Sequence, residues 1–147
     1  MSRLDDVKEV LFNQIEDKGP KYKRLNGYDH LFGVSALCGK MAKERGLDVE
    51  LACIIGLLHD CSTYITGNTY RHALWSSEYA SKFLRSLPFS DEEITIITNA
   101  IRNHSSKERI DDEYSELIKD ADVLHQYLQQ PDALFSKDYQ DRLDKML

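Results

Sequence analysis

The sequence predicts an all-α fold, a single compact bundle of about six to seven helices that takes in residues 1–147. Apolar residues recur at spacings of three and four along most of the chain, whereas the alternation typical of strands is almost absent. Only three prolines interrupt the pattern, at Pro20, Pro88 and Pro131. A chain of 147 residues suffices for one domain with a core and is too short for two.

The first two helices are bounded by glycines. An N-terminal helix is expected within residues 1–20 and ends at Gly19-Pro20. Its apolar face is formed by Leu4, Val7, Leu11 and Ile15. A second helix is expected from about 28 to 45, with Gly46 in the place of a left-handed C-cap.

The middle of the chain predicts two further helices with a loop between them. Asp48 is a good N-cap for a third helix over 49–60, which carries a nearly continuous apolar run. The polar string CSTYITGNT at 61–69 predicts a loop. A fourth helix is expected over roughly 70–87, before Pro88.

The last third has the strongest local signal, a capping box. Ser90 followed by Glu93 marks the start of a fifth helix. The string SSKERID at 105–111 predicts a loop, and a sixth helix is expected from about Asp112 to Leu128. The tail, 132–147, predicts a C-terminal helix over about 136–147 that packs on the outside.

Charge and cysteine usage narrow the compartment and the partners. A net charge of −6 argues against a nucleic-acid polymer or an anionic membrane as partner. The start MSRLDDVKEV has no signal-peptide pattern, and no apolar run approaches the roughly 20 residues of a membrane span. Cys38, Cys53 and Cys61 form no CxxC pair, so reduced thiols in a cytoplasmic protein are expected, with Cys61 as a small buried hydrophobe.

Several polar residues lie where their helices call for apolar ones. His30 shares a helix face with Val34 and Met41. His104 continues the face of Ile101. The same holds for three others: His59, His72 and Asp122. Burying such groups without partners costs several kcal/mol. A lone core histidine is usually satisfied by a hydrogen bond, but four on separate helices favour a shared metal cluster.

The chemistry of these residues restricts which metal ions the cluster can hold. Imidazole and carboxylate ligands without thiolate suit a catalytic ion, which could be Fe, Mn, Zn, Co or Ni, better than they suit a structural zinc site. With Asp60 there are six candidate ligands, which fit two ions bridged by a carboxylate better than one ion. His59 and Asp60 are neighbours that diverge by about 100° on a helix, so both can reach a cluster only if the helix ends there.

The order of His30, His59-Asp60 and Asp122 resembles the H…HD…D signature of the HD-domain phosphohydrolases. The surrounding strings YDHLFGVS, ACIIGLLHDCS and IKDADVLHQYL agree with it, and the resemblance covers about 28–128. It implies that His30, His59, Asp60 and Asp122 hold a first ion, and that Asp120 is a supporting or surface residue. His59 and Asp60 are accordingly expected to be catalytic.

The segment between the doublet and Asp122 points to a subgroup of that family. HALWSSEYASKFL and DEEITIITNAIRNHS resemble members with two further histidines. The resemblance implies that His72 and His104 hold a second ion, with Asp60 as the bridge. CSTY follows the doublet in place of the acidic pair of the alarmone hydrolases, which argues against guanosine tetraphosphate as substrate.

The expected activity is metal-dependent hydrolysis of a small phosphate ester, a nucleotide being one candidate, by hydroxide generated at the two ions. Candidate substrate contacts are Arg71, Lys107, Arg109 and Tyr64, although each cation alone is better explained as a solvated surface charge. His125 lies on the face of Asp122 and fits either proton transfer or a core hydrogen bond. Two other functions stay open: a di-iron oxygenase, which some relatives with six such ligands are, and a non-catalytic regulatory module that binds metal or nucleotide.

Overall fold

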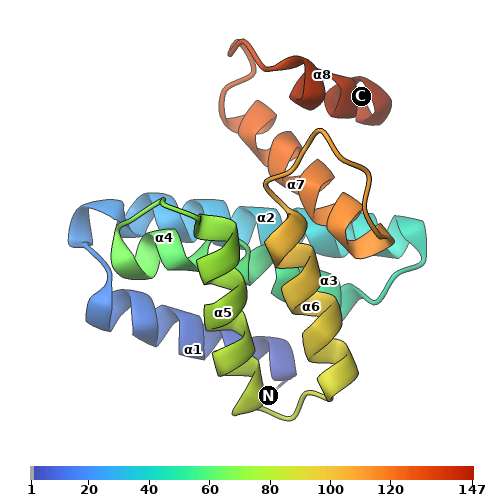
Figure 1. Ribbon diagram of the computed structural model, residues 1–147. Helices are drawn as coiled ribbons and strands as arrows, with labels where there is room; N and C mark the ends of the chain where they lie inside the picture. Colours follow the sequence, from blue (N-terminus) through green and yellow to red (C-terminus); the bar gives the residue numbers. More distant parts are fainter. Residues whose placement is uncertain (1) are drawn as a thin grey trace.

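The computed structural model describes residues 2–147 and confirms the all-α fold (Figure 1). Every regular element in these residues is helical. In chain order they are α1 (Arg3–Lys18), the 3-10 turn η1 (Lys21–Lys23), α2 (Arg24–Arg45), α3 (Val49–Leu58), α4 (Cys61–Thr66), α5 (His72–Arg85), α6 (Asp91–Asn103), α7 (Glu113–Gln129) and α8 (Lys137–Met146).

Three helix ends fall where a cap predicts them, whereas α2 begins at Arg24, before the expected start near residue 28. The Asp48 carboxylate accepts the Leu51 N–H at 3.0 Å and caps α3. Ser90 and Glu93 exchange both bonds of the capping box, at 3.1 and 3.0 Å, at the start of α6. Gly46 ends α2 at φ 70°, a left-handed conformation that glycine adopts without steric cost.

The prediction of a loop over 61–69 is wrong for residues 61–66, which form α4. Six residues are too few to show a helical period in the sequence. Tertiary contacts stabilise this turn instead: Ile65 is buried, and the Ser62 backbone N–H donates to the Ser76 hydroxyl of α5 at 3.1 Å. The short helix places Tyr64 beside the functional cleft described below.

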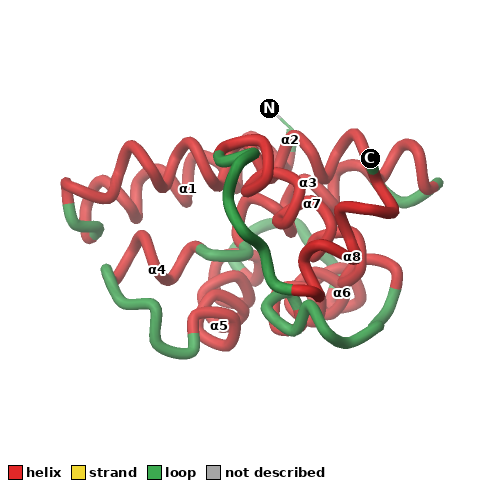
Figure 2. Tube along the Cα trace, turned by 90° about the horizontal axis from the view of Figure 1, so that it is seen from above, coloured by secondary structure: helices red, strands yellow, loops and turns green. Residues whose placement is uncertain are grey.

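The long helix α2 is the centre of the packing (Figures 1 and 2). α3 and α7 pack along α2, α5 and α6 lie side by side, and α1 covers α3 and α4. α3 is the core helix, with Ile54, Ile55, Leu57 and Leu58 fully buried. α3 packs against α2, α6 and α7.

One window, Val49–Thr66, is apolar enough by length and composition to cross a membrane, which differs from the expectation that no run comes near that length. Its mean hydropathy is 1.2 over 18 residues, and 61% of it is buried inside the fold. The window comprises α3 and α4, which are separate helices here. Core helices of this kind pass the same composition test, so the window is weak evidence for a span.

Candidate metal centre

The end of α3 turns His59 and Asp60 toward the same point. α3 ends at Leu58, His59 keeps helical angles, and Asp60 leaves them at φ −120° and ψ 19° before α4 begins. Neighbouring residues on a continuous helix would diverge by about 100°. The break in the helix therefore lets both side chains face one cluster, as the sequence required.

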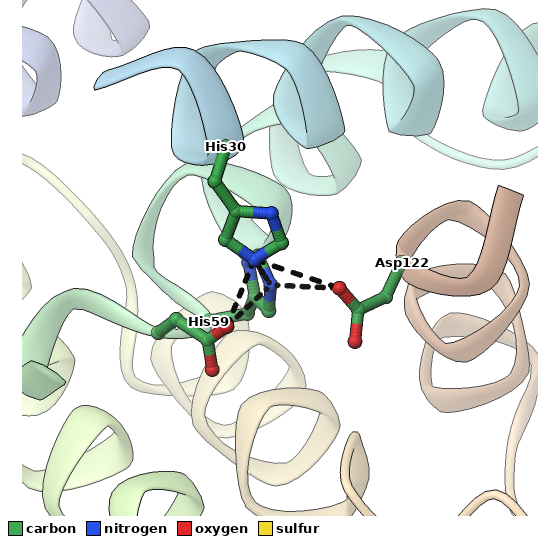
Figure 3. A group of neighbouring side chains, drawn as sticks. His30, His59 and Asp122 are labelled. Atoms are coloured by element: carbon green, nitrogen blue, oxygen red, sulfur yellow. Dashed lines mark hydrogen bonds and ion pairs between the residues drawn. The ribbon is translucent and has the colours of Figure 1, made fainter. Parts of the chain in front are cut away.

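The first group of donor atoms joins α2, the end of α3 and α7 (Figure 3). His30 Nε2 lies 3.0 Å from His59 Nε2 and 2.9 Å from Asp60 Oδ2. Asp122 Oδ1 lies 3.4 Å from His59 Nε2 and 3.6 Å from His30 Nε2. Four side chains from three segments thus converge on one point.

The second group uses the other oxygen of Asp60. Asp60 Oδ1 lies 3.0 Å from His104 Nε2 at the end of α6 and 3.5 Å from His72 Nε2 at the start of α5. His104 is buried, whereas the His72 side chain is 34% exposed. Asp60 is therefore the one residue that belongs to both groups.

Backbone carbonyls orient two of the imidazole rings. His59 Nδ1 lies 2.6 Å from the Gly56 carbonyl oxygen, and His104 Nδ1 lies 2.6 Å from that of Ile101. A carbonyl oxygen can only accept, so each Nδ1 carries the proton and donates it. This leaves both Nε2 atoms aimed at the cluster, which is how metal-binding histidines are usually held.

The donor set fits a divalent metal. Within each group the ligand atoms lie within 4.8 Å of one another, and they are imidazole nitrogens and carboxylate oxygens. Two ligands about 2.1 Å from one ion at right angles are about 3.0 Å apart. That separation matches the pair of His30 Nε2 and His59 Nε2 and the pair of His30 Nε2 and Asp60 Oδ2.

The two carboxylates dominate the electrostatics of the cluster. Burial lowers the pKa of the His59 imidazole, but Asp60 and Asp122 outweigh it and raise this pKa to about 10. Burial opposes ionisation of Asp60 and Asp122, yet neighbouring cationic groups hold both carboxyl pKa values well below their usual range. Both aspartates are therefore anionic at neutral pH and available to a cation.

Lys107 completes the environment of Asp122. Its ammonium donates to Asp122 Oδ2 at 2.7 Å and to the His104 carbonyl at 2.8 Å, and the residue is only 7% exposed. Asp122 thus gives one oxygen to Lys107 and turns the other toward His30 and His59. A charge-assisted bond of this kind restricts the carboxylate to one orientation.

The cluster forms the floor of a cleft of about 550 Å³. Tyr64 and His125 form part of its wall, and the His125 ring lies 5.4 Å from the His30 ring. Gly33 on α2 makes this approach possible, since a Cβ there would lie 2.3 Å from His125 Nε2. The volume suits a small molecule.

Of the four predicted substrate contacts, two lie in the cleft wall and two are exposed on the surface. Tyr64 and Lys107 line the cleft. Arg71 is exposed just before α5, and Arg109 is exposed and donates to Asn103 and Asp111. The roles predicted for all four remain predictions.

Sequence reasoning missed several residues of the cleft wall, among them Gln126, Gln129 and Tyr139. Gln126 and Gln129 follow Asp122 by four and seven positions, so helical spacing alone could have placed them on its face. Tyr139 comes from α8, and no local pattern indicates that this helix folds back to the cleft. Its place depends on tertiary packing.

Comparisons with known proteins agree with this arrangement. The model of the HD domain matches residues 27–127. The chain is 33% identical over 99 residues to Ribonuclease Y of Chlorobium luteolum, covering 67% of this chain and 17% of that protein. It is 33% identical over 131 residues to Ribonuclease Y of Mycoplasma mycoides subsp. mycoides, covering 82% of this chain and 24% of that protein. The chain therefore spans about a fifth of the length of these curated relatives.

A solved structure shares the whole fold. It is a protein described as a predicted HD superfamily hydrolase from an uncultured Thermotogales bacterium, with a TM-score of 0.64 and 22% identity. The match covers 95% of this chain and 86% of that one. At this identity the likeness shows a shared fold.

Proposed function

The chain belongs to the HD domain family, and from this premise we propose that it is a metal-dependent phosphohydrolase acting on a small phosphate ester, a nucleotide being one candidate. The observation that carries the proposal is the pair of donor groups sharing Asp60 at the floor of a cleft. Two metal sites a few ångströms apart are the arrangement by which many phosphatases hold a phosphate.

The proposed cofactor is a pair of divalent ions, chosen from Fe, Mn, Co, Ni and Zn. His30, His59, Asp60 and Asp122 would hold the first, and Asp60, His72 and His104 the second. When bound, such a pair supplies Lewis acidity, which activates water and offsets the charge of a phosphate. His59 and His104 would keep their ligand atoms aimed by donating to backbone carbonyls, and Lys107 would hold Asp122 in its orientation.

The cleft wall favours a small ester over a polymer. Among the described residues that line it, Lys107 supplies the only Lys or Arg side chain, and its ammonium is already bound to Asp122. The amides of Gln126, Gln129 and Asn26 line the wall instead, and these groups suit a neutral hydrogen-bonding moiety such as a nucleoside or a sugar. A polynucleotide is usually held by rows of cations, and the chain as a whole carries −6.

The test is a substrate panel on protein loaded in turn with Mn²⁺, Co²⁺ and Ni²⁺. The panel contains p-nitrophenyl phosphate, bis-p-nitrophenyl phosphate, nucleoside monophosphates and a short single-stranded RNA. We expect phosphate release from one or more monoesters, without oxygen, and its loss in His59→Ala. Because the relatives are named as ribonucleases, preferential cleavage of the RNA would overturn the small-ester proposal.

Two outcomes would overturn the proposal of hydrolysis and favour another function. Oxygen uptake by iron-loaded protein, with a mixed-valent di-iron spectrum, would indicate the oxygenase. Full metal loading without turnover of any substrate would indicate a module that binds metal or nucleotide without catalysis.

A further inference from the structure

The C-terminal helix α8 lies outside the part of the chain that matches the HD domain, yet it contacts the surroundings of the metal centre. The match ends at residue 127, and α8 comprises Lys137–Met146. In Figure 1 the orange loop between α6 and α7 rises to the underside of α8. Leu143 of α8 is buried, so the helix is packed against the molecule.

Arg142 makes the main polar contact between α8 and this loop. Its Nε and Nη2 both donate to the Lys107 carbonyl, at 3.1 and 2.9 Å, and Nη2 also donates to the Arg109 carbonyl at 3.0 Å. Nη1 donates to Glu116 at 3.0 Å and to Asp120 at 2.9 Å. These five bonds match the five N–H groups of a guanidinium, and Arg142 is 9% exposed.

The loop residue that Arg142 holds is also the one that contacts the cluster. The backbone of Lys107 is bound by Arg142, while its ammonium is bound to Asp122 and to the His104 carbonyl. Tyr139 of α8 adds a second contact, with the Lys107 ammonium 5.5 Å from its ring centroid. A continuous path of contacts thus runs from α8 through Lys107 to ligands of both groups.

We propose that Arg142 is a positioning residue of the metal centre, which acts through Lys107 on the orientation of Asp122. The inference rests on the metal centre of the proposed function. Without Arg142 the Lys107 carbonyl loses both of its donors, and the Lys107 ammonium is no longer held against Asp122 Oδ2. Asp122 is then free to turn away from His30 and His59, which weakens metal binding although no ligand has changed.

The test is a double-mutant cycle read out as Mn²⁺ affinity, measured by titration calorimetry. The variants are Arg142→Leu, Lys107→Met and the double variant. Loss of an outer partner of a metal ligand typically costs about 10–100-fold in affinity, and we expect about tenfold for each single variant. Because both act along one path, the double variant should bind Mn²⁺ about as well as the weaker single variant.

The matched control is Gln140→Ala on the same helix, since Gln140 is exposed and bonds only along α8 to Asp144. It should keep the wild-type affinity. Arg142→Leu with wild-type affinity, or single effects that multiply in the double variant, would overturn the proposal. Failure of the wild-type protein to bind Mn²⁺ would also overturn the proposal.

A milder variant protects the test against loss of the fold. Arg142→Lys keeps the charge but cannot form the planar fork to two carbonyls, so it should bind Mn²⁺ more weakly with an unchanged circular dichroism spectrum. Unchanged affinity in this variant would also overturn the proposal. All these measurements omit substrate. A chain that hydrolyses no phosphate ester but loses Mn²⁺ affinity as described would therefore overturn the proposed function and leave this inference standing.

Discussion

Asp60 joins the two halves of the cluster through the two oxygens of one carboxylate. Oδ2 faces His30 at 2.9 Å, and Oδ1 faces His104 at 3.0 Å. The residue can do this because it follows the last turn of α3 and precedes α4, where the backbone is free of helical angles. A residue within a continuous helix would present its carboxylate to one side only.

We predict that Asp60→Asn loses both metal ions, because the amide keeps the volume but removes the charge and one of the two ligand oxygens. His104→Ala should lose about one ion of two, since His104 belongs to the second group alone. Inductively coupled plasma analysis of protein purified without chelator measures both. Two ions per chain in Asp60→Asn would contradict the shared carboxylate.

Arg71 is the one described non-glycine residue with positive φ, at 49°, and it directly precedes the candidate ligand His72. Left-handed angles cost a residue with a Cβ about 1–2 kcal/mol. We predict that the free energy of unfolding of Arg71→Gly exceeds that of Arg71→Ala by about 1 kcal/mol, so that Arg71→Gly unfolds at a higher temperature. Thermal unfolding of the two variants measures it.

The same two variants test the predicted substrate contact. Both variants lack the guanidinium, so an equal loss of kcat/KM in both would show that the charge of Arg71 contributes to activity. A loss in only one variant would instead be due to the backbone conformation at this position.

Residue patterns predicted which side chains meet, but not how they are held. His30 and His104 stand out because each interrupts an apolar face, and a buried polar group needs a partner. The bonds that orient His59 and His104 go to backbone carbonyls, which have no signature in side-chain sequence. Lys107 and Arg109 looked alike as loop cations, yet Lys107 is buried against Asp122 and Arg109 is exposed.

At the scale of elements, Arg3 ties three helices together near their N-termini. It donates from α1 to Glu50 of α3 at 2.6 Å and to Glu93 of α6 at 2.8 Å. Glu93 also accepts the Ser90 N–H in the capping box. Hydrogen bonds from Arg3 and from Ser90 lower the pKa of the Glu93 carboxyl to about 2.

We predict a pH-dependent loss of stability in Glu93→Gln. The pKa is about 2 in the folded state against 4.5 for the ordinary carboxyl, so the stabilisation is fully present above about pH 4.5 and is lost as pH falls toward 2. Glutamine keeps the capping bond, which isolates the charge. The melting temperature should fall by about 2–4 °C at pH 7, and the difference should shrink at pH 3. A constant difference across this range would contradict the assignment.

Element boundaries were predictable where a cap marks them and unpredictable where packing alone decides. Asp48, Ser90 and Gly46 act within a few residues, so the ends of α2, α3 and α6 are visible in the sequence. α4 is stabilised by hydrogen bonds to residues of α5 that lie 10 and 14 positions later, whereas its polar string alone predicts a loop. A pattern of local propensity does not contain such contacts.

At the scale of the whole molecule, metal binding at the cluster would be coupled to folding. Its ligands come from α2, α5, α6, α7 and the end of α3, which converge only in the folded state. Asp60 and Asp122 place two carboxylates in a largely buried site, and a bound cation would offset their charge. An unfolded chain has no such preformed site, so a metal ion held by the cluster would bind the native state selectively.

We therefore predict that the melting temperature rises with Mn²⁺ concentration and falls on treatment with EDTA. At an ion concentration of about 100 times the dissociation constant, one site stabilises the native state by about 2.7 kcal/mol. For a chain of this size that corresponds to an increase of roughly 5–10 °C. Scanning fluorimetry over a Mn²⁺ series measures it. Asp60→Asn should show no dependence, because the residue shared by both groups is gone. An equal rise in that variant would mean that Mn²⁺ stabilises the fold from outside the cluster.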